Sequence, residues 1–229
     1  MKKLLLILLC VPLLFSCGGN NEKDNSLSLY KKNLETCKNL SKASVEYDIE
    51  TIEDLLTEDF EYYSYPINQP KGVKWNKSDA INSSIFKRDL GIKYQLKHSI
   101  YLPGIDTVNL QMDGSVRVYY SALISVKGEE IEITAYETVD FKDGKISRID
   151  HFSDISAFQI SFNDIYCASE DCINGKNDTI NYKDSDENLI LQYIGPFKHG
   201  YFHGQGTMIT ADGEVYEGLW EYGKFIGKE

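Results

Sequence analysis

A histidine and a carboxylate near the end of one strand-like segment are the residues best suited to chemistry. His151 and Asp154 stand three positions apart in the run HFSD. A carboxylate that orients an imidazole can make the histidine a general base near neutral pH. A single histidine on a strand is more commonly a core or rim residue with satisfied hydrogen bonds, so a structural role for His151 stays open beside the catalytic one.

Other side chains that could line a pocket with this pair are aromatic or polar. The candidate pocket residues are Tyr62, Trp75, His98, Tyr120, Tyr136, His151 and Asp154, with Tyr63 and Asp150 adjacent to two of them. No dyad spacing, glycine-rich loop or metal-ligand motif accompanies them, and neither HExxH nor GxSxG occurs. We therefore expect no metal and no cofactor, and the catalytic residue stays unassigned.

The first elements along the chain that must position these residues are helices, which the spacing of apolar residues predicts. One predicted helix face holds Tyr30, Leu34, Cys37, Ser41 and Ser44. Asp48 can cap a second short helix, and Asn76 followed by Asp79 predicts the start of a third. On the first helix we expect Cys37 to be a buried thiol rather than a reactive one.

Strand spacing follows after Gly91. Alternating residues predict strands over 94–102, 116–126, 131–141 and 146–152. Turns are expected at Asp113-Gly114, at Lys127-Gly128 and over residues 142–145. Short turns predict an antiparallel meander. Helices followed by such a meander indicate the α+β class, with the helices packed on one face of a curved sheet.

Four stretches of this first block resemble the nuclear transport factor 2-like superfamily, which includes SnoaL-like polyketide cyclases, ketosteroid isomerase and scytalone dehydratase. They are DIETIEDLLTEDFEYYSYP, KWNKSDAINSSI, DGSVRVYYSALI and VDFKDGKISRIDHFSD, within residues 27–160. The resemblance implies a cystatin-like cone whose pocket, between helices and sheet, uses an Asp, His or Tyr as acid or base. It also implies that HFSD can close the domain structurally, and that two cones can pair through open sheet faces as a homodimer.

The tail, residues 193–229, repeats itself. Tyr193, Gly195, Phe197, Gly200 and Gly204 recur as Tyr216, Gly218, Trp220, Gly223 and Gly227, an offset of 216 − 193 = 23 positions. Glycines that permit turns and aromatics that stack predict a hairpin in each unit, with Asp212-Gly213 at a tip. The pattern, which also contains Gly206, resembles the MORN repeat. Two units are fewer than the roughly three that an independent solenoid needs, so the tail should rest on the first block or on a partner.

Two roles for this tail stay open: a docking surface for a protein or lipid, and a small structural cap. It lacks the basic amphipathic surface that attracts anionic lipids. Residues 161–192 before it indicate a linker or a degenerate repeat. Within them Cys167 and Cys172 could form a disulfide in an oxidising compartment.

The first residues, MKKLLLILLCVPLLFSCGG, combine two lysines, an apolar run and a small residue before a cysteine. That layout predicts a secretory signal over residues 1–16, too short to span a bilayer. The run LFSC resembles the lipobox of bacterial lipoproteins, which implies a lipid on Cys17 that anchors the protein to a membrane. Residues 17–26 would then form a polar tether. Gly18 stands where an inner-membrane retention signal carries aspartate, which favours the outer membrane; whether the protein faces the periplasm or the outside stays open.

Charge excludes one class of partner. The formal charge is −11, and loss of two lysines with the signal gives −11 − 2 = −13. Nucleic acid is therefore not expected to bind, because its binding depends on cations that neutralise phosphates. Two hypotheses for the cone remain. It is a noncatalytic module for a small apolar ligand or a protein, which the tether and tail favour, or a SnoaL-like isomerase, cyclase or dehydratase acting on a hydrophobic carbonyl compound.

Overall fold

The computed structural model describes residues 20–65, 70–153, 175, 178–184, 186–198 and 200–228. Four of the residues singled out from the sequence lie outside these ranges: Cys17, Asp154, Cys167 and Cys172. Among the described helices none is both long enough and apolar enough to cross a membrane.

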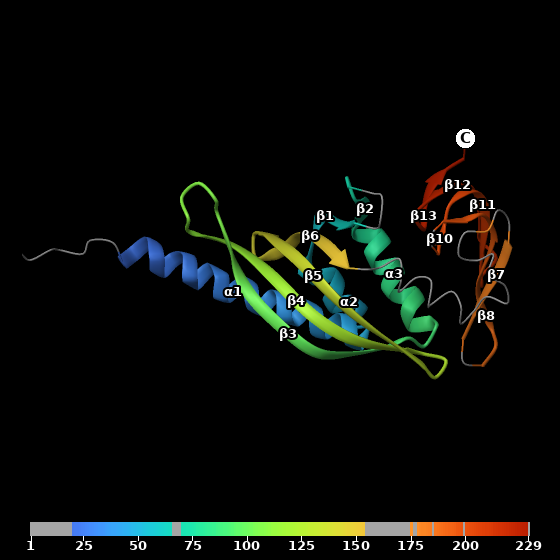
Figure 1. The fold of residues 1–229 in the computed structure, drawn as a ribbon, viewed down its shortest axis with the longest axis horizontal. Helices are drawn as coiled ribbons and strands as arrows, with labels where there is room; N and C mark the ends of the chain where they lie inside the picture. The colour runs from blue at the N-terminus through green and yellow to red at the C-terminus, as the bar shows by residue number, and fades with distance from the viewer. Residues whose placement is uncertain are drawn as a thin grey trace, which may run out of the picture.

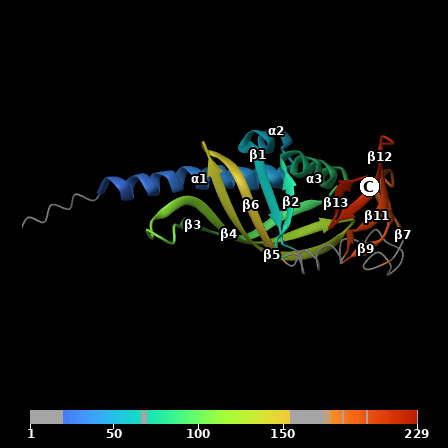
Figure 2. The same ribbon diagram turned by 90° about the horizontal axis from the view of Figure 1, so that it is seen from above.

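Three helices cover one face of a six-stranded sheet (Figures 1 and 2). The helices are α1 (Asn20–Glu46), α2 (Ile49–Leu55) and α3 (Lys77–Asp89). In spatial order the strands are β2 (Val73–Asn76), β1 (Leu56–Ser64), β6 (Lys145–Ser153), β5 (Glu129–Lys142), β4 (Met112–Val126) and β3 (Lys93–Ile105). The expected α+β class, with helices on a curved sheet followed by an all-β tail, is confirmed.

One strand pair departs from the expected antiparallel meander. Strand β1 runs parallel to β6, whereas the other neighbours in this sheet are antiparallel. The chain leaves β1, builds β2, α3 and the strands β3 to β5, and returns as β6 on the free side of β1 in the same direction. The sheet is therefore mixed.

Local capping sets the starts of the two shorter helices as the sequence predicted. Asp48 accepts a hydrogen bond from the Thr51 amide at 3.1 Å. Asn76 and Asp79 form a reciprocal capping box, with both bonds at 2.9 Å. Such caps satisfy amides that the first turn of a helix leaves unpaired. Both predicted helix starts are confirmed.

The first helix begins earlier than expected. It starts at Asn20, so most of residues 17–26, expected as a tether, are helical in the structure. No glycine or proline occurs between residues 20 and 47. Polar side chains alone do not stop a helix, because only glycine and proline carry a large penalty in its interior.

Turns follow the predicted sites in two of three cases. Lys127-Gly128 and Asp143-Gly144 have positive φ at both positions, as tight hairpin turns require. The turn predicted at Asp113-Gly114 is wrong: both residues lie within β4, and the chain turns over residues 106–111 instead. Gly114, at φ 86°, lies beside a register shift between Pro103 and Ile105, so it serves a bulge rather than a turn.

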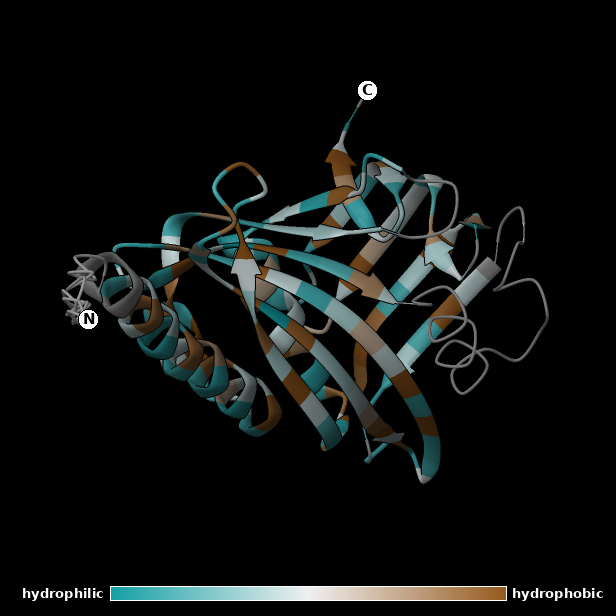
Figure 3. Ribbon diagram, turned by 60° about the vertical axis from the view of Figure 1, so that its left-hand side comes forward, coloured by the Kyte–Doolittle hydropathy of each residue, from teal (hydrophilic) through white to brown (hydrophobic). Residues whose placement is uncertain are grey.

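The cone has its core between α1, α2 and the inner face of the sheet. Alternating bands of apolar and polar residues run along its long strands (Figure 3). The core residues are Tyr30, Cys37, Ala43, Ile52, Leu56, Phe60, Val116, Val118, Val139, Ile146 and Ile149. Cys37 is a free, buried cysteine whose pKa burial raises to about 12, with the charge of Glu137 adding to the effect. It is an inert part of this core.

The tail, which in the structure includes the strands from residue 178 onward, forms a five-stranded sheet and a separate two-stranded sheet. Its strands are β7 (Asp178–Lys183), β8 (Leu189–Gly195), β9 (Phe197–Lys198), β10 (Tyr201–Phe202), β11 (Gly204–Thr210), β12 (Val215–Glu221) and β13 (Lys224–Gly227). Five of them pair in the order β13-β12-β11-β8-β7, and β9 pairs with β10. Residues 178–183, expected within a linker or degenerate repeat, supply the outermost strand of this sheet.

Glycines in the tail let one tyrosine ring lie directly on the strands. Tyr193 is fully buried, and a Cβ added to Gly206 or to Gly195 would clash with its hydroxyl oxygen, at 2.7 Å in the case of Gly195. The ring stacks on Phe202 with centroids 3.9 Å apart. Burial raises the pKa of Tyr193 to about 12. These glycines of the repeat are therefore required by close packing.

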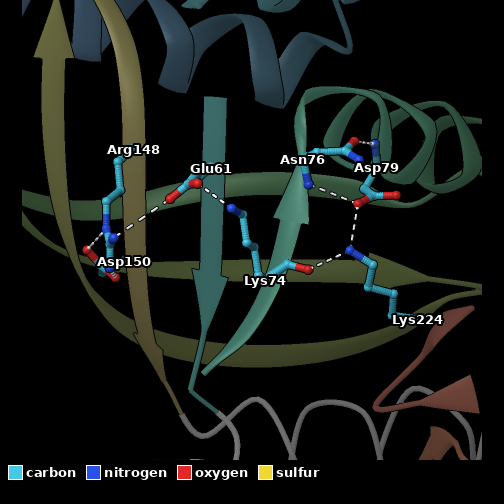
Figure 4. A network of polar contacts seen from close by, with 7 residues as sticks. All are labelled: Glu61, Lys74, Asn76, Asp79, Arg148, Asp150 and Lys224. Atoms are coloured by element: carbon cyan, nitrogen blue, oxygen red, sulfur yellow. Dashed lines mark hydrogen bonds and ion pairs between the residues drawn. The ribbon is translucent and has the colours of Figure 1, made fainter. Parts of the chain in front are cut away.

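Cone and tail share one hydrophobic cluster. From the cone it contains Leu90, Ile92, Ile124 and Val126, and from the tail Ile180, Tyr182, Leu191, Tyr193, Phe197 and Trp220. A chain of polar contacts also joins them (Figure 4). Lys224 of β13 donates to the Lys74 carbonyl at 2.7 Å and to Asp79 Oδ2 at 3.1 Å. Because the aromatic side of the tail is buried on the cone, the two blocks pack as one body.

Candidate functional site

Glu137 and His151 lie side by side on the inner face of the sheet, which the helices cover. They are direct cross-strand partners on β5 and β6. His151 Nδ1 lies 2.8 Å from Glu137 Oε1, and Nε2 of the same ring lies 2.8 Å from Ser153 Oγ. The histidine is only 5% exposed. A carboxylate bonded to Nδ1 fixes the tautomer and the orientation of the ring, so that Nε2 can act as a base when the Ser153 hydroxyl turns away from it.

Two tyrosines complete the surroundings of this pair. The Tyr120 hydroxyl donates to Glu137 Oε1 at 3.2 Å. The Tyr62 ring lies over the imidazole, with centroids 5.8 Å apart and planes inclined by 31°. With Glu137 ionised and His151 neutral, Nδ1–H donates to Glu137 and Nε2 accepts from the Ser153 hydroxyl. The arrangement is that of an oriented base among phenols.

Both phenols stay protonated over the physiological range. Burial, followed by the negative charge of Glu137, raises the pKa of Tyr62 and of Tyr120 well above 10. A phenol with a raised pKa is a stable hydrogen-bond donor to a carbonyl oxygen or an oxyanion.

A third phenol has a free hydroxyl nearby. The Tyr47 hydroxyl is buried and has no hydrogen-bond partner among the described residues. Its ring meets that of Tyr94 edge-on, 6.2 Å between centroids, and Tyr94 also raises the pKa of Tyr62 and Tyr120. An unpaired buried polar group costs about 1–3 kcal/mol. A bound molecule with an acceptor atom would remove that cost.

The tail reaches the same region. Tyr201 of β10 is among the groups that raise the pKa of Tyr62, after burial and Glu137. Lys224 Nζ lies 5.9 Å from the centre of the Trp75 ring, and Trp75 is the cross-strand partner of Tyr62. Residues from the repeat thus lie beside the inner site of the cone.

The candidates named from the sequence divide between the two faces of the sheet. Four of them, Tyr62, Trp75, Tyr120 and His151, share the inner face. His98 is exposed and pairs with Ser121 on the outer face, where the Tyr136 ring also lies, its centroid 4.6 Å from that of Tyr119 and the planes inclined by 33°. These two residues do not join the inner group.

Neighbouring residues noted from the sequence also lie on the outer face. Asp150 accepts two bonds from Arg148 at 2.8 and 2.9 Å and one from Tyr65 at 2.8 Å. Burial opposes its ionisation, but these hydrogen bonds outweigh burial and keep the pKa of Asp150 below its usual value. Tyr63 carries the Arg148 guanidinium over its ring at 4.2 Å. This group is a structural ion pair, connected through Glu61 to the contacts of Figure 4.

The partner of His151 is Glu137, a residue that was not predicted from the sequence. A signal was present: Ala135, Glu137 and Val139 alternate along β5, so an acidic residue occupies an inward position between two apolar ones. An inward carboxylate on a buried face needs hydrogen-bond partners. Tyr120 and His151 supply them.

Two hollows in the described part of the molecule lie elsewhere. One of about 460 Å³ is lined by Leu29, Asn33, Asp113 and Asp140, among others. Another of about 280 Å³ lies beside Leu56. Within the described ranges no three His, Cys, Asp or Glu side chains gather as a metal site would need.

No protein-family model matches the chain, and no curated protein matches it. Among solved structures, a putative polyketide cyclase from Xanthomonas campestris is similar over 57% of this chain and 96% of its own, at 12% identity and a TM-score of 0.46. An NTF2-like protein from Burkholderia xenovorans covers 54% and 90%, at 14% identity and 0.43. An epoxide hydrolase from M. tuberculosis covers 55% and 84%, at 12% identity and 0.43. The similarity covers about half of this chain and concerns the fold alone. It does not carry the substrates of those proteins over to this one.

Proposed function

We propose that the cone binds a small hydrophobic carbonyl compound and catalyses proton transfer at the carbon next to the carbonyl, as an isomerase, cyclase or dehydratase would. The observation that carries this proposal is the buried pair in which Glu137 Oε1 holds His151 Nδ1 at 2.8 Å. A histidine base held by a carboxylate and surrounded by protonated phenols has the parts that enolisation needs.

Each group has a distinct task in the proposed reaction. When substrate displaces the Ser153 hydroxyl from His151 Nε2, that nitrogen accepts the proton from the α-carbon, and Glu137 stabilises the imidazolium that forms. The Tyr62 hydroxyl, protonated because of its raised pKa, donates to the oxygen on which negative charge develops. The imidazolium then returns the proton to another carbon in an isomerisation, or to the hydroxyl group that the enolate expels as water in a dehydration, and His151 is neutral again.

Deuterium exchange tests the shared first step without knowledge of the natural substrate. The chain is incubated in deuterated buffer with 2-tetralone and two other hydrophobic ketones, and exchange at the α-carbon is followed by NMR. His151→Gln should slow exchange by about 10²–10⁴-fold, as loss of a general base does. Glu137→Gln should slow it by about 10- to 100-fold, because a bond to a charged group is worth about 1.5–3 kcal/mol.

His98→Gln is the matched control, because His98 lies exposed on the outer face and should leave exchange unchanged. Parent protein that exchanges no faster than buffer with any of the ketones would refute catalysis.

A second candidate is a binding module without catalysis. The observation that favours it is the burial of the site: His151 is 5% exposed, and Tyr201 of the tail lies near Tyr62. In this case the ketones raise the melting temperature but show no exchange. Absence of both effects would rule out a carbonyl ligand for the cone altogether.

The location of the protein is part of the proposal. We place it on a membrane through a lipid on Cys17, after export, with the outer membrane as the favoured address. The sequence LFSC at the end of the apolar run supports this. Loss of labelling by a palmitate analogue in Cys17→Ser is expected, and unchanged labelling would refute the anchor.

For the tail we favour the structural cap over the docking surface. Its aromatic residues Tyr193 and Trp220 are buried in the cluster shared with the cone. A docking role would need the outer side of the tail sheet. Pull-down from detergent-solubilised membranes with and without residues 190–229 tests it, and identical recovered partners would exclude the tail as an adaptor.

A further inference from the structure

The hairpin loop between β3 and β4 presents large apolar side chains to solvent. Val108 is 93% exposed and Leu110 is 73% exposed. Ile105, at the base of the loop, is also exposed. Among the described residues no packing buries these side chains, and apolar groups gathered at one projecting point are typical of a contact with a partner or a membrane.

Local conformation does not explain Leu110 either. Its φ is 58°, in the left-handed region where asparagine or glycine is comfortable and leucine costs about 1–2 kcal/mol. The position therefore carries a residue that is unfavourable for the backbone and unburied in the fold. Neither burial among the described residues nor backbone preference accounts for leucine at this position.

Five of the six backbone amides of residues 106–111, all but that of Thr107, donate to acceptors within the loop. Asp106 Oδ1 accepts from the Val108 and Asn109 amides at 2.7 and 3.2 Å, and the Asp106 carbonyl accepts from the Leu110 amide at 2.9 Å. The Gln111 amide donates to Asn109 Oδ1 at 2.8 Å, and the Asp106 amide donates to the Gln111 carbonyl. Amides paired in this way can leave water without the penalty of unmade hydrogen bonds.

The loop lies at the end of the molecule where the chain would meet a membrane. In Figures 1 and 2 it projects on the side where α1 begins, away from the tail. Helix α1 is hydrogen-bonded to the base of this loop, since Asn33 of α1 donates to the Gly114 carbonyl of β4 at 2.8 Å. Helix α1 begins at Asn20, three residues after Cys17, so Cys17 can lie at most about 10 Å from the start of the helix.

We propose that Val108 and Leu110 insert into the bilayer surface beside the lipid on Cys17, as a second point of attachment. This inference rests on the proposed anchoring. Two attachment points would fix how the cone stands on the membrane, which one lipidated residue cannot do. Asp106 and Asp113 flank the loop and the chain without its signal carries a formal charge of −11 − 2 = −13, so the fitting surface is zwitterionic rather than anionic.

Tryptophan depth measurements test the insertion. Full-length protein, expressed with its signal and purified from membranes, is reconstituted into phosphatidylcholine vesicles with or without brominated acyl chains. Val108→Trp should add emission that is blue-shifted and lost in the brominated vesicles. The control is Val215→Trp, an exposed position (58%) in the tail sheet, whose added emission should be unaffected.

Intact mass of the same sample reports whether Cys17 is acylated, so failure of the anchor is seen separately from failure of the loop. Quenching at position 108 and not at 215 supports insertion. Quenching at neither position, or at both, overturns it, since the first leaves the loop in water and the second lays the whole molecule on the surface.

Discussion

Leu90→Ala should destabilise the cone and the tail together. Leu90 follows α3 directly, is 3% exposed, and belongs to the cluster that contains Ile124 of the cone and Trp220 of the tail. The substitution removes three carbons, worth about 2.4 kcal/mol at roughly 0.8 kcal/mol each. An unfilled cavity raises the cost toward about 5 kcal/mol. With a urea m-value of about 2 kcal/mol/M, the midpoint should fall by about 1–2.5 M.

Two signals separate the blocks in one urea titration. All helices among the described residues lie between 20 and 89, so circular dichroism at 222 nm reports the cone. In a Trp75→Phe background, fluorescence of Trp220 reports the tail. Both midpoints should coincide and fall by the same amount. The matched control, Leu102→Ala, removes a side chain that is 47% exposed and should change stability by no more than about 0.5 kcal/mol. A fall in the helical midpoint with an unmoved Trp220 midpoint would refute the shared core.

Three further predictions concern the tail, its polar tie and the buried phenols. Gly206→Ala should cost about 1–3 kcal/mol in thermal unfolding, since its Cβ would meet the buried Tyr193 ring, and an unchanged melting temperature would contradict the close packing. Lys224→Met should cost about 1 kcal/mol, less at high salt, because it removes the part-exposed bond to Asp79; equal loss at all salt concentrations would argue against an ionic contribution. Raised folded-state pKa values of tyrosines such as Tyr62 mean that stability is full below the unfolded value of about 10 and declines as pH rises through the folded values. In a pH titration followed by tyrosinate absorbance at 295 nm, one group of tyrosines should therefore ionise only as helicity is lost. Ionisation of all tyrosines near pH 10 with intact helicity would contradict the raised pKa values.

Elements set by local chemistry could be predicted from the sequence. The capping box of Asn76 and Asp79 involves residues three positions apart, so its signal lies in a short stretch of chain. The pair Asp113-Gly114 shows the limit of such signals. A glycine with positive φ suits a bulge as well as a turn, and only pairing with β3 decides between them.

The position of Glu137 opposite His151 depends on the register between β5 and β6, which cannot be derived from the sequence. Lys142 pairs with Lys145, and continued without interruption that register (142 + 145 = 287) would place Glu137 opposite Asp150. A shift between Asp140 and Phe141 changes the sum to 288 and places Glu137 opposite His151. One residue of slip moves a side chain to the other face of a sheet. The sequence therefore identified the histidine but not the carboxylate that orients it.

The positions of the two ends of the molecule bear on what the repeat tail does. Helix α1 has 27 residues and so spans about 40 Å, and the tail lies at the end of the molecule opposite its start (Figure 1). A chain held by lipid at Cys17 and by the loop at Val108 would hold the tail away from the bilayer rather than against it. Contact of the repeat with lipid and attachment at the opposite end are therefore incompatible in one orientation. The burial of Tyr193 and Trp220 against the cone accounts for the aromatic residues of the repeat without any lipid, by the need to complete a core that the cone alone leaves open beside Ile124 and Val126.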